Sequence, residues 1–367
     1  MPSISIDLGS STIKVFFSRG GAPQPLVMLP EVAWVDLAQL DELSINSSVG
    51  AEYCAWLELK DEIIAVGQLA ENFNGDDAIA ERKQRRAVYK ALAILGVVRE
   101  KLNLPTSFGA HIAVMLPITE YKDRVQVQEA LKLAAGNFAF RGQPLSVDLH
   151  TCLMLPEGFG LYAVCKNSLK LKGIDPSTRT IFVLMFGHRN LSVLVFQNGA
   201  LQTGKSSSDG PGFCEAVKAG AAVQGLRTSE YSKLLKALAL KEPKIRVVGE
   251  YGLVDVSQAI TVGTASYWRQ ADSYLRNVLT PVLTDDNCEL AIGGGAAWTM
   301  REEVQELFKR IGLAHRVNWA SDLQTHLESL LASYPQYQNQ PGLAARMVDP
   351  FANYQSIAQI SKIGAAA

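Results

Sequence analysis

The residues best suited to do chemistry lie near the start of the chain, in a short turn between two apolar runs. Asp7 stands close to the end of the run Ile4–Leu8, and a second run starts at Ile13. A turn of this kind offers glycine for close backbone approach, hydroxyls and N–H groups for an anion, a carboxylate for hydrated Mg²⁺ and a lysine for phosphate. We therefore expect a β-hairpin with a phosphate pocket, in which Asp7 binds Mg²⁺ through water; an ordinary edge hairpin is the plainer alternative. The expected phosphate ligands are Gly9, Ser10, Ser11, Thr12 and Lys14.

A similar pattern returns in the second half of the chain. Two apolar runs, 180–186 and 191–196, flank a polar turn and predict a second hairpin. A glycine-containing loop at 207–212 precedes a helix expected to begin near Phe213, and three glycines follow the apolar strand 288–292. Glycines at such junctions let backbone lie against a phosphate or a flat ligand. The expected ligands from the two glycine segments are Gly210, Gly212, Gly293, Gly294 and Gly295.

One carboxylate stands at a predicted junction between a strand and a helix. Glu157 lies between Pro156 and Gly158, after the apolar run 145–155. A carboxylate at such a place can orient a water molecule, which makes Glu157 the candidate catalytic residue. From the spacing alone, the simpler interpretation is favoured, in which Glu157 is an acidic residue in a surface loop.

The segment from Gly199 to Ser206 satisfies the Walker A pattern literally. A P-loop needs a strand that ends at the first glycine and a helix that begins at the Lys-Ser pair. Here Asn198-Gly199 is a hairpin signal, and the residues after Lys205 are turn formers rather than helix formers. We interpret the match as accidental.

The elements around these segments predict an α/β protein. Short strands are expected over 26–75, helices over 81–103 and 122–135, and a doubly covered strand over 111–117. Further helices are expected over 227–244, 255–279, 302–311 and 320–333. Because strand, glycine turn and strand occur in both halves, the pattern indicates a duplicated α/β domain with a small β-rich insertion in the first copy.

Composition excludes several classes of protein. The net charge is −1, which gives no basic surface for direct binding to nucleic acid. The five cysteines and five histidines show no zinc-site or disulfide spacing, which favours a reducing compartment. No stretch is long and apolar enough to predict a membrane span or a secretion signal. We expect a cytoplasmic protein.

As an ordered set, these segments resemble those of the actin, Hsp70 and sugar-kinase superfamily, and within it the bacterial plasmid-segregation actins of ParM type. Residues 6–12 are similar to the first phosphate loop, and 156–158 to the first connecting segment. The run 115–118, followed by Tyr121, is similar to the Gly-Leu-Pro segment of this branch. Residues 186–190 fall where the second phosphate loop belongs, which implies that Gly187, His188, Arg189 and Asn190 bind the nucleotide. Residues 292–295 resemble the adenosine loop. The resemblance implies two ribonuclease H-like domains, each with a mixed five-stranded sheet flanked by helices, and ATP or GTP with Mg²⁺ in the cleft between them. The implied domains are 1–165 plus 335–367, with the insertion at about 26–75, and 166–334.

The chain departs from that family pattern in three places. Met115 stands where glycine is usual, while Met185 and Ser192 replace acids of the second phosphate loop. The acid missing at 185 would help to order the hydrated Mg²⁺ and the attacking water, at a loss of about 2.7 to 4 kcal/mol of transition-state stabilisation. We expect nucleotide binding with slow or altered hydrolysis, so that any enzymatic activity is a weak ATPase.

The resemblance implies a homopolymer. We expect nucleotide-regulated filaments that serve plasmid segregation or a cell-shape cytoskeleton, together with a small adaptor protein that supplies any link to DNA. Two alternatives remain open: a non-polymerising scaffold that binds ATP as a structural ligand, and a small-molecule kinase of the same superfamily. A P-loop nucleotidase comes last, and Lys205→Ala would test it.

Overall fold

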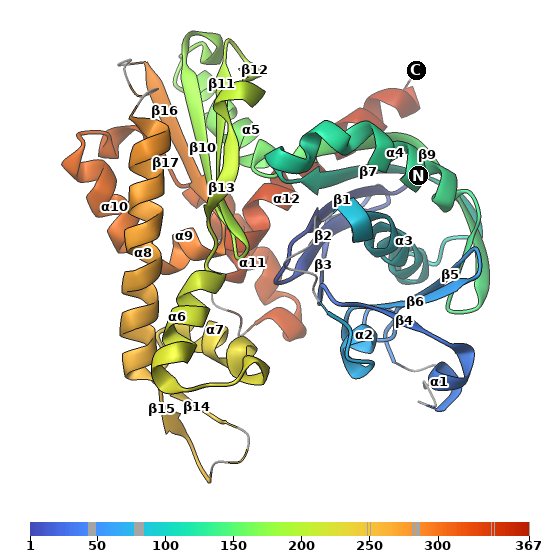
Figure 1. Ribbon diagram of the computed structural model, residues 1–367. Coiled ribbons are helices and arrows are strands. Elements are labelled where there is room, and N and C mark those ends of the chain that lie inside the picture. Colours follow the sequence, from blue (N-terminus) through green and yellow to red (C-terminus); the bar gives the residue numbers. More distant parts are fainter. Residues whose placement is uncertain are drawn as a thin grey trace. The chain divides into compact units, whose positions relative to one another are not determined.

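The computed structural model describes residues 1–42, 49–76, 84–247, 249, 251–280, 283, 287–338, 340 and 342–366 (Figure 1). The chain divides into two compact units, residues 1–157 with 350–367 and residues 158–349. The limits expected from the sequence, 165/166 and 334/335, remain predictions.

Unit 1 is built on one long mixed sheet with the strand order β3-β2-β1-β7-β9-β8-β5-β6-β4. Strands β1, β7 and β9 are parallel, and the β1–β2 hairpin is antiparallel. The strands are β1 (Ser3–Leu8), β2 (Ile13–Ser18), β3 (Gln24–Met28), β4 (Val32–Val35), β5 (Trp56–Leu59), β6 (Glu62–Val66), β7 (Ser107–Leu116), β8 (Phe138–Phe140) and β9 (Gln143–Pro156). The helices are α1 (Leu37–Glu42), α2 (Gln68–Asn72), α3 (Gln84–Lys101) and α4 (Arg124–Ala135), the last preceded by the 3-10 turn η1 (Ile118–Asp123).

Helix α3 is the centre of the unit 1 core. Its residues 90–98 are buried on every side, as expected for a helix enclosed by its own sheet. Alternate residues of β1, β2 and β7 point into this core, while Phe16 points to the opposite face. There the end of α12 (Leu343–Ala366) covers the sheet: the rings of Phe16 and Phe351 lie 4.8 Å apart, and the hydroxyls of Ser18 and Tyr354 lie 2.6 Å apart.

Unit 2 has a sheet of order β12-β11-β10-β16-β17, with β13 paired to β11, and a separate β14–β15 hairpin. Helices α6 and α8 cover one face of the sheet, and α5 covers the other, where Tyr162 stacks on Phe196 at 3.8 Å. The strands are β10 (Thr180–Phe186), β11 (Asn190–Gln197), β12 (Ala200–Leu201), β13 (Ser207–Pro211), β14 (Lys244–Ile245), β15 (Val254–Asp255), β16 (Cys288–Gly293) and β17 (Val317–Asn318). The helices are α5 (Phe159–Leu171), α6 (Cys214–Gln224), α7 (Tyr231–Leu240), α8 (Ser257–Leu279), α9 (Gly295–Thr299), α10 (Arg301–Arg310) and α11 (Ser321–Ala332).

The expected α/β class, the two glycine-turn hairpins and the β-rich insertion are confirmed. Two details differ. The five strands β3-β2-β1-β7-β9 do not end the first sheet, because β8 continues it into the insertion strands. Residues 207–211 form strand β13 and not a loop, because they pair with β11. The first residues of the helix expected over 81–103 lie outside the described part, and α3 begins at Gln84.

Within the described residues, none of the helices combines the length and the apolar character that crossing a bilayer requires.

Candidate functional site

The first hairpin turn places a buried ion pair beneath its backbone. Asp7 and Lys14 are directly opposite each other in the β1–β2 ladder, and the ammonium of Lys14 contacts Oδ2 of Asp7. Both residues are less than one tenth exposed. Gly9 passes close by: a Cβ there would lie 2.4 Å from the carbonyl oxygen of Thr12 and 3.0 Å from Nζ of Lys14. The turn therefore requires glycine, and it holds one carboxylate and one ammonium together.

Parallel pairing brings Glu157 to the same edge of the sheet as Asp7. Asp7 is paired with Met115, and Met115 with Leu155, so the carboxyl ends of β1, β7 and β9 align. Strands lie about 4.8 Å apart, which puts Asp7 and the end of β9 roughly 10 Å apart across the sheet. Glu157 is half-buried, two residues past Leu155, and its N–H donates to the carbonyl of Leu116 at 2.9 Å.

The second hairpin turn is packed against β13 and α6. The N–H groups of Phe213 and Cys214 donate to the carbonyls of Gly187 and His188, at 3.1 and 2.9 Å. A Cβ at Gly212 would lie 2.1 Å from the carbonyl oxygen of Arg189. Gly212 is therefore needed for this packing, whether or not a ligand binds.

Gly210 is explained in the same way. A Cβ there would lie 2.5 Å from the ring of Tyr274, whose hydroxyl donates to Oγ of Ser207 at 2.9 Å. Burial raises the pKa of Tyr274 above its ordinary value, so the phenol stays neutral and can donate. Asn190 also supports the turn, since its amide donates to the carbonyl of Ser208 at 2.8 Å.

The glycine loop after β16 lies beside the second hairpin turn. Strands β10 and β16 are parallel, with Met185 opposite Gly293. Gly294 has φ of 99°, and a Cβ there would lie 2.4 Å from the carbonyl oxygen of Phe186. A side chain is excluded both by the backbone conformation and by space. The structure thus brings two of the predicted segments of unit 2, the 187–190 turn and the 293–295 loop, to one edge of one sheet.

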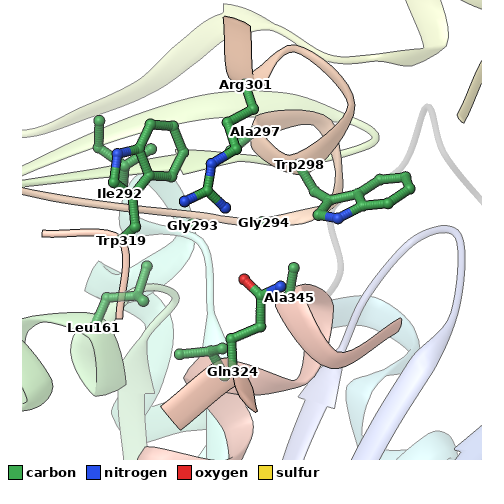
Figure 2. Close-up of a pocket in the computed structure, with 11 residues that line it drawn as sticks. Leu161, Ile292, Gly293, Gly294, Ala297, Trp298, Arg301, Trp319, Gln324 and Ala345 are labelled. Atoms are coloured by element: carbon green, nitrogen blue, oxygen red, sulfur yellow. The ribbon is translucent and has the colours of Figure 1, made fainter. Parts of the chain in front are cut away.

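A pocket opens next to this glycine loop (Figure 2). The guanidinium of Arg301 points into it and lies over the ring of Trp319, 4.7 Å from its centre. Trp298 and Gln324 supply further polar edges, and the amide of Gln324 donates to Glu328 at 2.9 Å. The remaining wall is apolar and comes from Leu161, Ile292, Ala297, Ala345 and Val348.

The cavity volume here is about 20 Å³, which is room for a single water. As the side chains lie here, that volume does not admit a purine base. The cation–π contact of Arg301 with Trp319 is worth about 0.5 to 1 kcal/mol at a partly exposed site. The donor set and the aromatic walls suit a flat, acceptor-rich ring.

Sequence reasoning missed Trp298, Arg301, Trp319 and Gln324. One signal was present: Trp298 and Arg301 stand three residues apart, directly after the glycines, which is a spacing that places side chains on one helix face. Trp319 and Gln324 carry no such signal, because only the tertiary fold brings them to this loop.

The Walker A match is not a phosphate loop. Asn198 and Gly199 both have positive φ and form the tight turn between β11 and β12. Lys205 ends a short 3-10 turn, and its ammonium donates to the side chain of Gln197 at 2.9 Å. Strand β13 follows instead of the required helix.

A magnesium site made only of protein ligands is not seen in the described part of the chain, where no three His, Cys, Asp or Glu side chains cluster. Mg²⁺ in nucleotide enzymes uses one or two carboxylates, several waters and the phosphates of the substrate. The buried Asp7 carboxylate beside the Lys14 ammonium fits that arrangement, with Asp7 as the single protein carboxylate.

No protein-family model matches the chain, and no curated protein sequence matches it. Solved structures do. The actin-like protein Alp7A has a TM-score of 0.67 at 12% identity, over 99% of this chain and 98% of that one. Ta0583, an archaeal actin homologue solved in complex with ADP, has a TM-score of 0.64 at 13% identity, over 98% and 100%. A ParM filament from Clostridium botulinum has a TM-score of 0.62 at 14% identity, over 98% and 99%.

Proposed function

Because the chain has the actin-like fold, we propose that it binds ATP or GTP with Mg²⁺ and assembles into filaments regulated by the nucleotide. One observation carries the proposal: the 187–190 turn and the 293–295 loop meet at one sheet edge, beside a pocket with aromatic walls. The ADP complex of Ta0583 and the ParM filament support the two halves of the proposal, nucleotide binding and self-association.

The proposal gives each segment a role. In this proposal Arg301 leaves Trp319 and the base enters the pocket of Trp298, Arg301 and Trp319. The two hairpin turns bind the phosphates through backbone N–H groups and Lys14. Asp7 holds the hydrated Mg²⁺, which when bound would neutralise phosphate charge. Glu157 orients the attacking water. The remaining proposed ligands are Gly9, Ser10, Ser11, Thr12, Gly187, His188, Arg189, Asn190, Gly210, Gly212, Gly293, Gly294 and Gly295.

Hydrolysis in this proposal is slow. Met185 occupies the position at which the family resemblance implies an acid, and its thioether cannot accept the strong hydrogen bonds or hold the charge that a carboxylate would. The same residue supports a second candidate function, a scaffold that binds ATP as a structural ligand without turnover.

The biological role follows from the resemblance. We propose a cytoplasmic filament for plasmid segregation or cell shape, with a small adaptor protein as partner. The net charge of −1 supports an indirect link to DNA, because direct binding needs a basic surface.

Nucleotide binding is tested by tryptophan fluorescence during titration with ATP, GTP or ADP in the presence of Mg²⁺. Because Trp298 and Trp319 line the pocket, we expect a saturable change. Arg301→Ala is expected to weaken binding about tenfold, which corresponds to the loss of one charged contact. Arg310→Ala, on the same helix but outside the pocket, is the matched control and should leave affinity unchanged.

Assembly is tested by light scattering and electron microscopy of the same samples, with phosphate release followed in parallel. Filaments that form with ATP or GTP and not without nucleotide are the expected result. Saturable binding without filaments would favour the scaffold, and phosphate transfer to a panel of sugars and acids would favour the kinase. No binding of any nucleotide would overturn the proposal.

A further inference from the structure

The chain passes between its two units twice, at Glu157/Gly158 and at Asp349/Pro350. These two passages are tied together by one side chain. Asp349 is 3% exposed, and its carboxylate accepts hydrogen bonds from the N–H groups of Gly158 at 2.9 Å, Gly160 at 2.7 Å and Leu161 at 3.3 Å. The first of these bonds joins residues that are 191 positions apart in the sequence.

The three N–H groups belong to the start of α5, where a helix has no acceptors of its own. A local Ser, Thr, Asp or Asn usually caps such an end, but here the N-cap residue is Gly158, which has no side chain. Gly158 is required by its φ of 95° and by space, since a Cβ would lie 2.9 Å from Cγ of Met185. A carboxylate at a helix N-terminus also interacts favourably with the helix dipole. Asp349, which is distant in the sequence, therefore caps the N-terminus of α5 in place of a local side chain.

Asp349 also fixes the backbone that carries Glu157. The N–H of Glu157 donates to the carbonyl of Leu116 in unit 1, and the next N–H, that of Gly158, donates to Asp349 in unit 2. Both peptide groups around Glu157 are thus held, one on each side of the passage. Loss of the Asp349 bond would release one of the two peptide groups that hold the backbone of Glu157.

At the second passage, the hydrogen-bonded Asp349 is followed directly by a residue that interrupts the helix bonds. Pro350 follows Asp349 within α12, and the helix bond from residue 350 to the carbonyl of Arg346 cannot form because proline has no N–H. One turn further on, both amide atoms of Asn353 are buried without a hydrogen-bond partner among the described residues. Helix α12 is therefore held at Asp349 and weakened directly after it.

We propose that Asp349 is a positioning residue for the hydrolytic reaction, which fixes Gly158 and thereby aims Glu157, and which ties the two passages to each other. The role of Asp349 in hydrolysis rests on the proposed function, whereas the tie between the passages is independent of it.

The tie is tested by hydrogen exchange on the full chain. Asp349→Asn keeps the shape of the side chain and removes its charge. We expect exchange in the peptide covering 158–161 to become about tenfold faster, which corresponds to the loss of one charge-assisted bond. Asp349→Glu keeps the charge and is expected to restore part of the protection. Asp322→Asn, an exposed acid in the first turn of α11, is the matched control and should change nothing at 158–161.

Unchanged exchange at 158–161 in Asp349→Asn would overturn the tie. Unchanged exchange in α3 and α8 would show that the variant is folded. If Asp349→Asn does not fold, Asp349→Glu decides. Protection at 158–161 below that of the unsubstituted protein would support the tie, because the longer side chain displaces the carboxylate. Protection equal to that of the unsubstituted protein would oppose it.

The positioning role is tested by kinetics. Asp349→Asn is expected to lower kcat about tenfold and to change nucleotide affinity less than about twofold, because Asp349 acts on the water-orienting group and not on the ground-state ligand. When Glu157→Gln is already present, adding Asp349→Asn should lower kcat no further, as expected for two residues that act as one unit. Equal kcat in Asp349→Asn and the unsubstituted protein would overturn the positioning role. Failure of the unsubstituted protein to bind nucleotide would instead overturn the proposed function and this role with it, while the exchange result still decides the tie.

Discussion

Met185 has a more specific place than the sequence alone indicates. It is half-buried at the end of β10, opposite Gly293, and a Cβ on Gly158 would lie within 2.9 Å of its Cγ. The residue at the position of the missing acid is therefore next to the residue that follows Glu157. A change of charge at 185 would act where the attacking water is proposed to lie.

The first prediction concerns this position. Met185→Asp should increase the rate of phosphate release at least about tenfold, because one well-placed charge contributes about 2.7 to 4 kcal/mol to a transition state and part of that is lost to imperfect fit. Single-turnover measurements on the bound nucleotide separate this effect from affinity. Met185→Leu, which changes shape but not charge, should leave the rate unchanged. Equal rates for all three proteins would remove Met185 as the cause of slow hydrolysis.

The hydroxyl of Tyr267 is a polar group that is buried in the core and lowers the stability of the fold. Its side chain is fully buried in α8, 5.2 Å from the ring of Phe213, and its hydroxyl has no hydrogen-bond partner within the described residues. Burial raises the pKa of Tyr267 far above its ordinary value, so the neutral phenol is the only form present.

We therefore expect Tyr267→Phe to increase the free energy of unfolding by about 1 kcal/mol, because it removes an unsatisfied buried hydroxyl. Tyr354→Phe makes the same chemical change where the hydroxyl is bonded to Ser18, and it should lower stability by about 1 kcal/mol. Urea denaturation followed by circular dichroism measures both. Two changes of the same sign would contradict this account.

The sequence could predict candidate site residues only where consecutive residues carry the signal. Asp7, Gly9 and Gly294 stand out in the sequence as candidates, because a tight turn needs particular residue types at consecutive positions. Trp319 and Asp349 were not, because each acts on a segment far away in the chain. Gly210 and Gly212 remain predicted ligands, and the structure gives both glycines a packing reason that needs no ligand.

Among the helices of unit 2, α6 and α8 cross with their backbones in close contact. A Cβ on Gly220 would lie 2.6 Å from the carbonyl oxygen of Ala259, and one on Gly263 would lie 2.5 Å from that of Ala216. Two glycines, one on each helix, thus let each backbone touch the other. The pair also explains glycines inside helices, where they are otherwise unfavourable.

Gly263→Ala tests this packing. Helix propensity alone would stabilise the variant by up to about 1 kcal/mol, but the added methyl meets a backbone oxygen and the helices must separate, which typically costs about 1 to 3 kcal/mol. We expect net destabilisation, measured as a lower melting temperature. Gly204→Ala, at a site with open space around it, should be close to neutral. A stabilised Gly263→Ala would show that the helices are not packed through these glycines.

Element prediction failed where pairing overrides local preference. Residues 207–211, with sequence Ser-Ser-Asp-Gly-Pro, have the composition of a turn, yet they form β13 because Asn190 and Leu191 pair with Pro211 and Gly210. In contrast, α3 was recognisable because its apolar residues recur at helical spacing over many turns.

For the chain as a whole, unit 2 is one continuous segment, 158–349, whereas unit 1 is assembled from both ends of the chain. A segment with its own sheet, its own core and helices on both faces of the sheet meets the requirements for independent folding. Unit 1 without residues 350–366 lacks the ring contacts that cover Phe16.

We predict that residues 158–349 expressed alone unfold cooperatively in urea, and that residues 1–157 expressed alone do not. Adding a peptide of residues 350–366 to the second fragment should restore part of its cooperativity, because Phe351 and Tyr354 then cover Phe16 and Ser18. A cooperative transition in 1–157 alone would show that α12 is dispensable for unit 1.

This arrangement has a consequence for synthesis on the ribosome. The β1–β2 hairpin is made before unit 2, but the α12 residues that cover its Phe16 face are made after unit 2, that is, after the 192 residues from 158 to 349. At 5–20 residues per second, that interval is roughly 10 to 40 s. Throughout it, an apolar strand face of the nascent chain stays uncovered, while unit 2 can already fold. The nascent protein is thus expected to need a chaperone at the β1–β2 hairpin rather than at the segment that has just been synthesised.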